Sequence, residues 1–251
     1  MNKTLLITGG ASGIGAETAR RAATRGYKVA LNYRSRDAQA KAVVADIEAK
    51  GGQAIALPGD MAREADILRM FEETERALGP LTHLVNSAGI SARMRVDEYD
   101  AAALNRLFAV NVVGLMLCCR EAARRMSTKN AGKGGAIVNV SSMAATLGGR
   151  LGSSAYAATK GAVDAFTKGF AREAAVEGIR VNSIRPGMVM TEMTEARLKE
   201  PAFRAGIEAS IPMRRVGLSH EIAEAILWLL SDESSFITGA MLDAAGGGYI
   251  I

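Results

Sequence analysis

The chain has 251 residues, of which 49% are hydrophobic and 23% charged, and its formal net charge at pH 7 is +5. These values are ordinary for a folded globular protein and argue against extended disorder. The basic residues are scattered along the chain, so we expect no nucleic-acid role, and the apolar runs are too short to predict a signal peptide or a membrane span.

Cysteine and histidine are scarce. Cys118 and Cys119 are adjacent in an apolar stretch and cannot easily bridge each other, so we expect two reduced core residues in a cytoplasmic protein. His83 and His220 are the two histidines, and they lie far apart in the sequence without a cysteine cluster beside them. We therefore predict no metal site.

The first element predicted is a buried strand over residues 5–8, and a helix follows over 16–25. Between them lies a turn with the spacing Gly9-x-x-x-Gly13-x-Gly15. Such a turn lets the backbone approach a pyrophosphate and directs the free N–H groups of the helix at the negative charge. A glycine loop by itself can also be only a tight turn.

Strands and helices alternate along the rest of the chain. The predicted strands are 29–33, 54–57, 81–85, 136–140, 180–184 and 240–243, and the predicted helices are 37–50, 64–78, 101–126, 153–176 and 222–230. This alternation is typical of parallel strands joined by right-handed crossovers, with helices on both faces. With no linker or repeat, the pattern predicts one doubly wound α/β domain over residues 1–251.

In a sheet of this kind the ligand binds beyond the carboxyl ends of the strands. The predicted strands end in residues with turn or hydrogen-bonding chemistry, such as Thr8, Asp60, Asn86, Ser142 and Gly187. We expect the functional site at that edge.

An acid/base pair is predicted on the helix 153–176. Tyr156 and Lys160 are four positions apart, so both side chains share one helix face. Free tyrosine and lysine titrate at roughly 10 and about 10.4, and a neighbouring ammonium would lower the pKa of the phenol towards working pH. Ser142 could hold a carbonyl oxygen beside this phenol. The Tyr-x-x-x-Lys pattern alone is weak, because such pairs also arise by chance.

Taken together, these residues resemble the short-chain dehydrogenase/reductase family over almost the whole chain, from Lys3 to about Gly248. The matching motifs are Thr8-Gly9-x-x-x-Gly13-Ile14-Gly15, Asp60, Asn86-x-Ala88-Gly89, Asn111, Ser142, Tyr156-x-x-x-Lys160, and Pro186-Gly187 followed by Thr191. The chain departs from the commonest pattern in two places. Ser87 replaces a second asparagine, and the chain closes with Gly246-Gly247-Gly248-Tyr249-Ile250-Ile251, an apolar tail that needs a place to bury.

The resemblance implies a reaction and a role for each catalytic residue. Hydride passes between a nicotinamide and a carbonyl or alcohol carbon, with Tyr156 as the general acid/base. Lys160 lowers the pKa of Tyr156 and holds the nicotinamide ribose, Ser142 orients the substrate carbonyl, and Asn111 fixes a water in a proton relay. The implied cofactor-binding residues are Gly9, Ser12, Gly13, Ile14, Gly15, Arg34, Ser35, Asp60, Met61, Asn86, Ala88, Gly89, Tyr156, Lys160, Pro186, Gly187, Val189 and Thr191.

The expected cofactor is NADP(H). Proteins that select NAD usually place an acid at the end of the second strand to bind the ribose 2′-hydroxyl. Here that strand ends Tyr33-Arg34-Ser35-Arg36, and no acid occurs before Asp37. The guanidinium of Arg34 suits a 2′-phosphate, although a solvated basic turn would read the same.

A mobile lid is expected over residues 188–216, which exceed a typical connection in length. The predicted substrate pocket is mostly apolar, with arginines near enough to meet an anionic tail. Its predicted lining residues are Ser91, Met94, Ala144, Leu147, Met188 and Met193, and the arginines are Arg93, Arg95 and Arg150.

Three functions remain open. A 3-oxoacyl-type carbonyl reductase is favoured by the overall resemblance, although Glu177 ends the helix where a basic surface could receive an acidic carrier protein. An NADP-dependent sugar or polyol dehydrogenase is the alternative. A non-catalytic nicotinamide-sensing protein is a third reading, but it would typically have lost the tyrosine or the lysine.

A homotetramer with dihedral symmetry is also expected. The helices 101–126 and 153–176 carry apolar residues over more of their circumference than one sheet face covers. The residues that suggest this are Val112, Leu115, Ala162, Phe166, Phe170 and the terminal Tyr249-Ile250-Ile251. In the family that the chain resembles, these helices form the main dimer interface.

Overall fold

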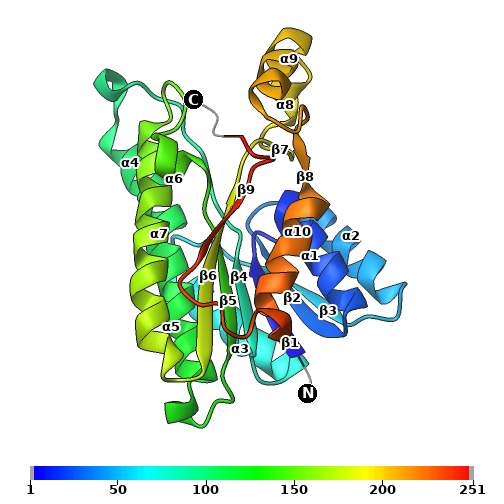
Figure 1. The fold of residues 1–251 in the computed structure, drawn as a ribbon. Coiled ribbons are helices and arrows are strands. Elements are labelled where there is room, and N and C mark those ends of the chain that lie inside the picture. The colour runs from blue at the N-terminus through cyan, green and yellow to red at the C-terminus, as the bar shows by residue number, and fades with distance from the viewer. Residues whose placement is uncertain (1–2, 249–251) are drawn as a thin grey trace.

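A parallel sheet of seven strands forms the centre of the molecule (Figure 1). The computed structural model describes residues 3–248, so the apolar tail 249–251 lies outside the described part. The strand order is β3-β2-β1-β4-β5-β6-β9, and every neighbouring pair is parallel. The strands are β1 (Lys3–Thr8), β2 (Tyr27–Tyr33), β3 (Ala54–Pro58), β4 (His83–Asn86), β5 (Gly135–Val140), β6 (Ile179–Pro186) and β9 (Met241–Ala244).

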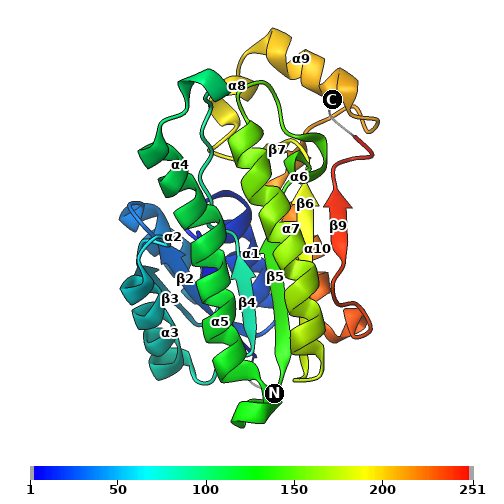
Figure 2. The same cartoon turned by 90° about the vertical axis from the view of Figure 1, so that its left-hand side faces the viewer.

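Helices cover both faces of this sheet (Figures 1 and 2). One layer contains α1 (Gly13–Thr24), α2 (Asp37–Glu48) and α10 (Ser219–Leu230), and the other contains α3 (Glu64–Leu78), α5 (Gly114–Met126) and α7 (Ser154–Ala175). Successive residues of β1 show the reason for two layers. Leu5 and Ile7 pack under the first layer and Leu6 packs under the second, because side chains alternate across a strand.

The predicted doubly wound α/β fold is confirmed, with shifts at several element ends. The strand predicted over 81–85 occupies His83–Asn86. The helix predicted over 101–126 is α4 (Ala101–Phe108), a π-helical turn over Ala109–Val113, and then α5. A Cβ on Gly114 would lie 2.2 Å from the carbonyl oxygen of Met61, so this glycine lets the helix approach the loop after β3.

The segment 188–216 contains secondary structure of its own. It holds β7 (Val189–Met190), α8 (Glu195–Leu198) and α9 (Pro201–Ser210), and β7 pairs with β8 (Gly217–Leu218) in a separate small sheet. Leu198, Ile207, Ile211 and Val216 form an apolar cluster there, apart from the two cores that sandwich the main sheet. Figure 1 shows α8 and α9 standing above the carboxyl ends of the strands.

Several short helices complete the described chain. They are α6 (Ala144–Leu147) and the 3₁₀ turns η1 (Val96–Glu98), η3 (Thr128–Asn130) and η4 (Asp232–Ser234), while η2 is the π-helical turn.

By length and composition, Ala101–Met126 is the one stretch among residues 3–248 that could cross a membrane. In the fold, its residues Leu115, Cys118, Cys119 and Met126 are buried in the apolar core beside the sheet. Burial against the sheet accounts for its apolar composition.

His83, at the start of β4, is a buried titratable group far from the carboxyl edge. It is 8% exposed, its ring meets the ring of Tyr27 edge-on with centroids 5.0 Å apart, and its Nδ1 lies 2.7 Å from Thr82 Oγ1. Burial, aided by the positive charge of Lys3, lowers the pKa of His83 from 6.5 to about 4. The folded protein therefore holds this ring neutral where an exposed histidine would take up a proton.

This shift predicts a pH-dependent loss of stability. Between pH 6.5 and about 4 the unfolded chain binds a proton at His83 that the folded chain does not, so stability falls as the pH falls through that window. The loss approaches about 3 kcal/mol at the acid end. We expect His83→Gln to flatten the pH dependence of the free energy of unfolding in urea over this range. His220→Gln, the control, should keep the wild-type slope, and equal slopes for wild type and His83→Gln would contradict the prediction.

Candidate active site

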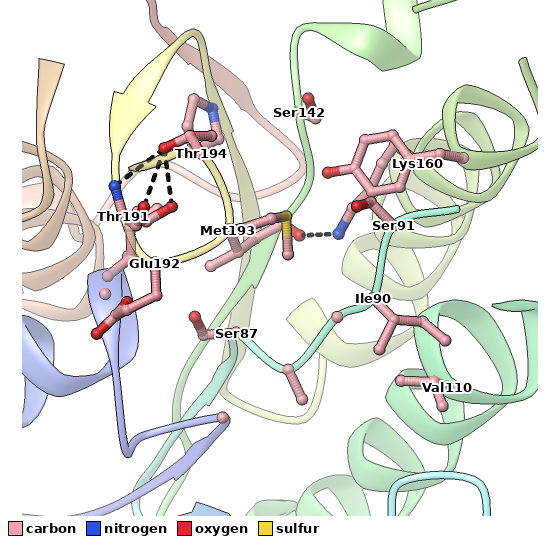
Figure 3. Close-up of a pocket in the computed structure, with 18 of the residues that line it drawn as sticks. Ser87, Ile90, Ser91, Val110, Ser142, Lys160, Thr191, Glu192, Met193 and Thr194 are labelled. Carbon is pink, nitrogen blue, oxygen red and sulfur yellow. Dashed lines mark hydrogen bonds between the residues drawn. The ribbon is translucent and has the colours of Figure 1, made fainter. Parts of the chain in front are cut away.

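A cavity of about 780 Å³ lies at the carboxyl ends of the strands, below α8 and α9. In Figure 3, Thr191 and Glu192 lie on one side of it, Ser91 and Lys160 lie on the other, and Met193 lies between them. The sequence-predicted site residues that line it are Gly9, Ser12, Gly13, Ile14, Arg34, Ser35, Asp60, Met61, Ala88, Gly89, Ser142, Tyr156, Lys160, Pro186, Gly187, Val189 and Thr191. Gly15, Asn86 and Asn111 are not among the lining residues and are buried.

The glycine turn after β1 lies in close backbone contact with the loop after β4 and with itself. Gly9 and Gly13 have φ angles of 67° and 52°, which favour glycine. A Cβ on Gly9 would lie 2.8 Å from Ala88 Cα, and a Cβ on Gly15 would lie 2.3 Å from the carbonyl oxygen of Gly9. The N-terminus of α1 therefore opens directly onto the cavity, where its free N–H groups can bind a phosphate.

Two polar side chains hold the neighbouring strand ends in place. Thr8 Oγ1 accepts hydrogen bonds from the N–H groups of Ser87 and Ala88, both at 3.1 Å. Asn32 Oδ1 accepts from the N–H of Gly9 at 3.3 Å, and its Nδ2 donates to the carbonyl of Gly59 at 3.0 Å. Asn32 thus joins the ends of β1, β2 and β3.

Asn86 was expected to touch the cofactor, but it is 2% exposed and lies below the cavity. Its Nδ2 donates to Asn139 Oδ1 at 2.9 Å, and Asn139 Nδ2 donates to Thr167 Oγ1 at 2.9 Å. This chain of amides joins β4 to β5 and to α7. Asn86 therefore supports the loop that carries Ala88 and Gly89 towards the cavity.

Asn111 sits in the π-helical turn and is 1% exposed. Its Oδ1 accepts from the N–H of Ile90 at 2.9 Å, and its Nδ2 donates to the carbonyl of Ile90 at 2.8 Å and to Thr159 Oγ1 at 3.2 Å. A Cβ on Gly89 would lie 3.5 Å from Asn111 Oδ1 and 3.7 Å from Lys160 Nζ. These are ordinary van der Waals distances, so both Asn111 and Lys160 lie directly behind the loop at Gly89. The expected water relay stays a prediction.

Tyr156, Lys160 and Ser142 meet at the deep end of the cavity. Lys160 Nζ donates to the carbonyl of Val140 at 2.8 Å and lies 5.7 Å from the centre of the Tyr156 ring. Ser142 Oγ accepts from the N–H of Ala144 at 3.1 Å, which leaves its own O–H group free to donate. The spacing of four positions thus brings both α7 side chains to one place.

Burial is the largest influence on the pKa of each member of this pair. Burial raises the pKa of Tyr156, although a hydrogen bond with Ser142 opposes the rise. Burial also lowers the pKa of Lys160 to about 8, against the opposing charge of Asp164. The ammonium of Lys160 donates to the carbonyl of Val140, and the expected lowering of the phenol's pKa by Lys160 stays a prediction. Because burial raises its pKa, Tyr156 keeps its proton at neutral pH.

At the other end of the cavity, Arg34 lines the wall. It has no ion-pair partner among residues 3–248. Asp37, the first acid after β2, accepts a hydrogen bond from the phenol of Tyr33 at 2.5 Å and pairs with Lys41 at 2.7 Å. This carboxylate is therefore engaged elsewhere and does not pair with Arg34, whose charge instead helps to lower the pKa of Asp60.

Arg106 is a lining residue that sequence reasoning missed. Its guanidinium lies 2.9 Å from Asp60 Oδ2. Burial alone would raise the pKa of Asp60, but hydrogen bonds from Arg106 and from the N–H of Ala62 hold it below its usual value. An arginine on a helix surface gives no sequence signal for this contact, because the partner is 46 positions earlier and meets it only in the fold.

The substrate end matches most of the predicted lining. Ser91, Ala144, Leu147, Met188, Met193, Arg93 and Arg150 line the cavity. Met94 and Arg95, also predicted there, are not lining residues, and Arg95 instead pairs with Asp97 at 3.0 Å. Arg197 and Phe203 line the cavity from α8 and α9 and were missed, since the long connection gave no indication of which side would face inward.

Comparison with known proteins assigns the chain to a family. Residues 9–249 match the family model described as enoyl-(acyl carrier protein) reductase. The chain is 46% identical to an uncharacterized oxidoreductase of Escherichia coli, YgfF, over 96% of this chain and 98% of that protein. It is 35% identical to the 3-oxoacyl-acyl-carrier-protein reductase FabG of Staphylococcus aureus, over 100% of this chain and 99% of that protein.

A solved structure supports the same assignment. A short-chain dehydrogenase of Burkholderia cenocepacia in complex with NADP superposes with a TM-score of 0.90 at 33% identity, over 98% of this chain and 97% of that chain. The shared fold, the residues gathered at the carboxyl edge and these relatives together show that the protein is an oxidoreductase of the short-chain dehydrogenase/reductase family, whose members use a nicotinamide cofactor.

Proposed function

We propose that the protein is an NADP(H)-dependent carbonyl reductase that acts on 3-oxoacyl-type compounds. The observation that carries this proposal is the layout of one cavity, with Tyr156, Ser142 and Lys160 at its deep end and Arg34, which forms no ion pair within residues 3–248, at its rim. A proton donor and a cation that suits a phosphate thereby line one site.

The residues present fit a dinucleotide. The N-terminus of α1 and the close turn at Gly9 and Gly13 suit the pyrophosphate, and Arg34 with Ser35 suits a 2′-phosphate. When bound, the cofactor supplies the hydride. The further residues proposed to hold it are Ser12, Ile14, Asp60, Met61, Ala88, Gly89, Lys160, Pro186, Gly187, Val189 and Thr191, with Gly15 and Asn86 acting from beneath.

The chain's own residues would handle the proton. Tyr156 keeps its proton at neutral pH because burial raises its pKa, so it can give that proton to a carbonyl oxygen as the oxygen gains charge. Ser142 can donate a second hydrogen bond to the same oxygen.

Relatives and lining both support an acyl substrate. The Staphylococcus aureus relative and a rat relative at 38% identity are both named 3-oxoacyl-acyl-carrier-protein reductases. Met188, Met193 and Leu147 make the substrate wall largely apolar, which fits an acyl chain better than a sugar.

The buried thiols of Cys118 and Cys119 also support the cytoplasmic location expected from the sequence.

Steady-state assays test this function. We expect NADPH-dependent reduction of acetoacetyl-pantetheine by the wild type, with little oxidation of D-glucose by NADP⁺ and little reduction of crotonyl-pantetheine. Tyr156→Phe should abolish turnover while NADPH fluorescence titration still shows binding, because only the proton donor is lost. Lys160→Ala should reduce both turnover and NADPH binding. Strong glucose oxidation without thioester reduction would favour the sugar dehydrogenase reading, and binding without any turnover would favour the nicotinamide-sensing reading.

Cofactor choice gives a second prediction. Arg34→Gln removes the charge proposed to meet the 2′-phosphate, so kcat/KM for NADPH should fall roughly 10- to 100-fold while kcat/KM for NADH changes little. Arg76→Gln, at an exposed position on α3, is the matched control and should change neither value. A wild type with higher kcat/KM for NADH than for NADPH would overturn the NADP assignment.

We also propose a homotetramer, although only some of the apolar residues considered in the sequence analysis support it. Val112 and Leu115 are buried within the subunit and do not bear on assembly. Phe108 and Val113 are 37% and 51% exposed on the outer side of the α4–α5 helix, and Phe166 and Phe170 stack with ring centroids 5.5 Å apart on α7. Light scattering should therefore give about four times the chain mass of 26.4 kDa, and a mass near that of one chain would refute the proposal.

The segment 188–216 is proposed to close over the bound cofactor. Thr191 and Met193 line the cavity from one side, and this segment packs on its own small cluster rather than into the main cores. We expect saturating NADP⁺ to slow tryptic cleavage at Lys199 and Arg204 relative to cleavage at Lys133. Equal cleavage rates with and without NADP⁺ would argue against closure.

A further inference from the structure

Three arginines converge on the outer end of the cavity, where the proposed mechanism uses none of them. Arg93 comes from the loop after β4, Arg150 from the loop between α6 and α7, and Arg197 from α8. Elements far apart in the sequence thus deliver like charges to one wall.

The two loops are tied together by their backbones. The N–H of Met94 donates to the carbonyl of Gly152 at 2.9 Å, and the Arg93 guanidinium donates to the carbonyl of Leu151 at 3.2 Å. Gly148, Gly149 and Gly152 have φ angles of 75°, 80° and 77°, so the second loop is built from conformations that favour glycine. This construction holds Arg93 and Arg150 beside each other.

An aromatic ring joins this pair of loops to α8 and α9. The guanidinium carbons of Arg150 and Arg197 lie 5.1 Å and 4.1 Å from the centre of the Phe203 ring. Stacking of this kind orients a guanidinium while leaving its N–H edge free to bind an anion. The same ring therefore aligns two cations that would otherwise repel each other.

No carboxylate balances these charges. Arg93, Arg150 and Arg197 form no ion pair anywhere in the described range 3–248, although Arg36 and Arg106 both do. The two acids that line the cavity are already engaged, Glu192 with Arg36 at 3.9 Å and Asp60 with Arg106 at 2.9 Å. Burial, followed by the charges of Arg197 and Arg93, lowers the pKa of Arg150, as expected where like charges gather.

We propose that Arg93, Arg150 and Arg197 form a subsite for an anionic group, a carboxylate or a phosphate, at the end of the substrate away from the reacting carbonyl. This proposal rests on the proposed function, because it names a property of the same substrate. It makes the enzyme selective for anionic oxo compounds over neutral ones. An anion bound there would also join α8 to the loop 148–152 and favour closure of the segment above the site.

Two matched pairs of NADPH-dependent substrates test the subsite. Acetoacetyl-4′-phosphopantetheine and acetoacetyl-pantetheine differ by a phosphate, and acetoacetate and methyl acetoacetate differ by a carboxylate charge. We expect wild type to prefer the anionic member of at least one pair, mainly through KM. Arg150→Gln and Arg197→Gln should each lower kcat/KM for that anionic member about tenfold. The kcat/KM for its neutral counterpart should stay within about twofold of the wild-type value.

The control and the rescue separate charge from structure. Arg95→Gln alters a neighbouring arginine that pairs with Asp97 outside the cavity, and it should leave all four substrates unaffected. Arg150→Lys should recover part of the loss because it restores the charge. A preference confined to the phosphate pair identifies a phosphate subsite, and one confined to the acid–ester pair identifies a carboxylate subsite.

Two outcomes overturn the proposal. The proposed subsite is wrong if wild type reduces the neutral and anionic members of both pairs equally, or if the variants lower kcat/KM by the same factor for both members. The proposed reductase function stands in either case. If none of the four compounds is reduced, the proposed function fails and the subsite is judged by calorimetry on NADPH-saturated enzyme. Pyrophosphate or succinate should bind wild type and fail to bind the Arg150→Gln/Arg197→Gln variant. Absence of binding to wild type refutes the proposed subsite.

Discussion

Buried side-chain amides hold the carboxyl edge of the sheet together, and the site depends on them. Asn32, Asn86 and Asn139 each bond to the end of a neighbouring strand or to a helix behind it. Asn111 does the same for the loop after β4 by pairing with both backbone groups of Ile90. Asn32 and Asn111 pair with buried backbone groups of the strand ends and loops, while Asn86 and Asn139 bond to other side chains, and together they set the shape of the cavity floor.

The π-helical turn has a cause in this arrangement. In a regular helix over 101–126, each side chain would be rotated from the previous one by a constant angle. The π-helical turn over Ala109–Val113 shifts the directions of the side chains that follow it by one residue position. Asn111 thereby faces the loop at Ile90 while Leu115 and Cys118 still face the core. The close contact at Gly114 with Met61 follows on the next turn, so the helix, the β3 loop and the cavity floor are fitted to one another.

Charge is distributed along the cavity in a consistent way. Arg34 stands at the rim proposed for the cofactor, a buried phenol and lysine lie in the middle, and Arg93, Arg150 and Arg197 stand at the outer wall. The acids Asp60 and Glu192 are each held by another arginine, which leaves positive potential at both ends. This distribution suits the proposed cofactor and the proposed subsite, and burial between them raises the pKa of Tyr156.

How much the sequence could determine depends on the range of the interaction. Alternating apolar runs gave the doubly wound fold, and local spacing gave the turn at Gly9 to Gly15 and the pair Tyr156 and Lys160, because these features depend on residues close together in the chain. The tertiary structure alone decided that Asn86 lies beneath the cavity, that Arg106 holds Asp60, and that Arg197 and Phe203 face inward. It also decided that burial, which depends on every surrounding element, raises the pKa of Tyr156 and lowers that of Lys160. Contacts between distant segments form only when the strands assemble into the sheet, so no local pattern in the sequence carries them.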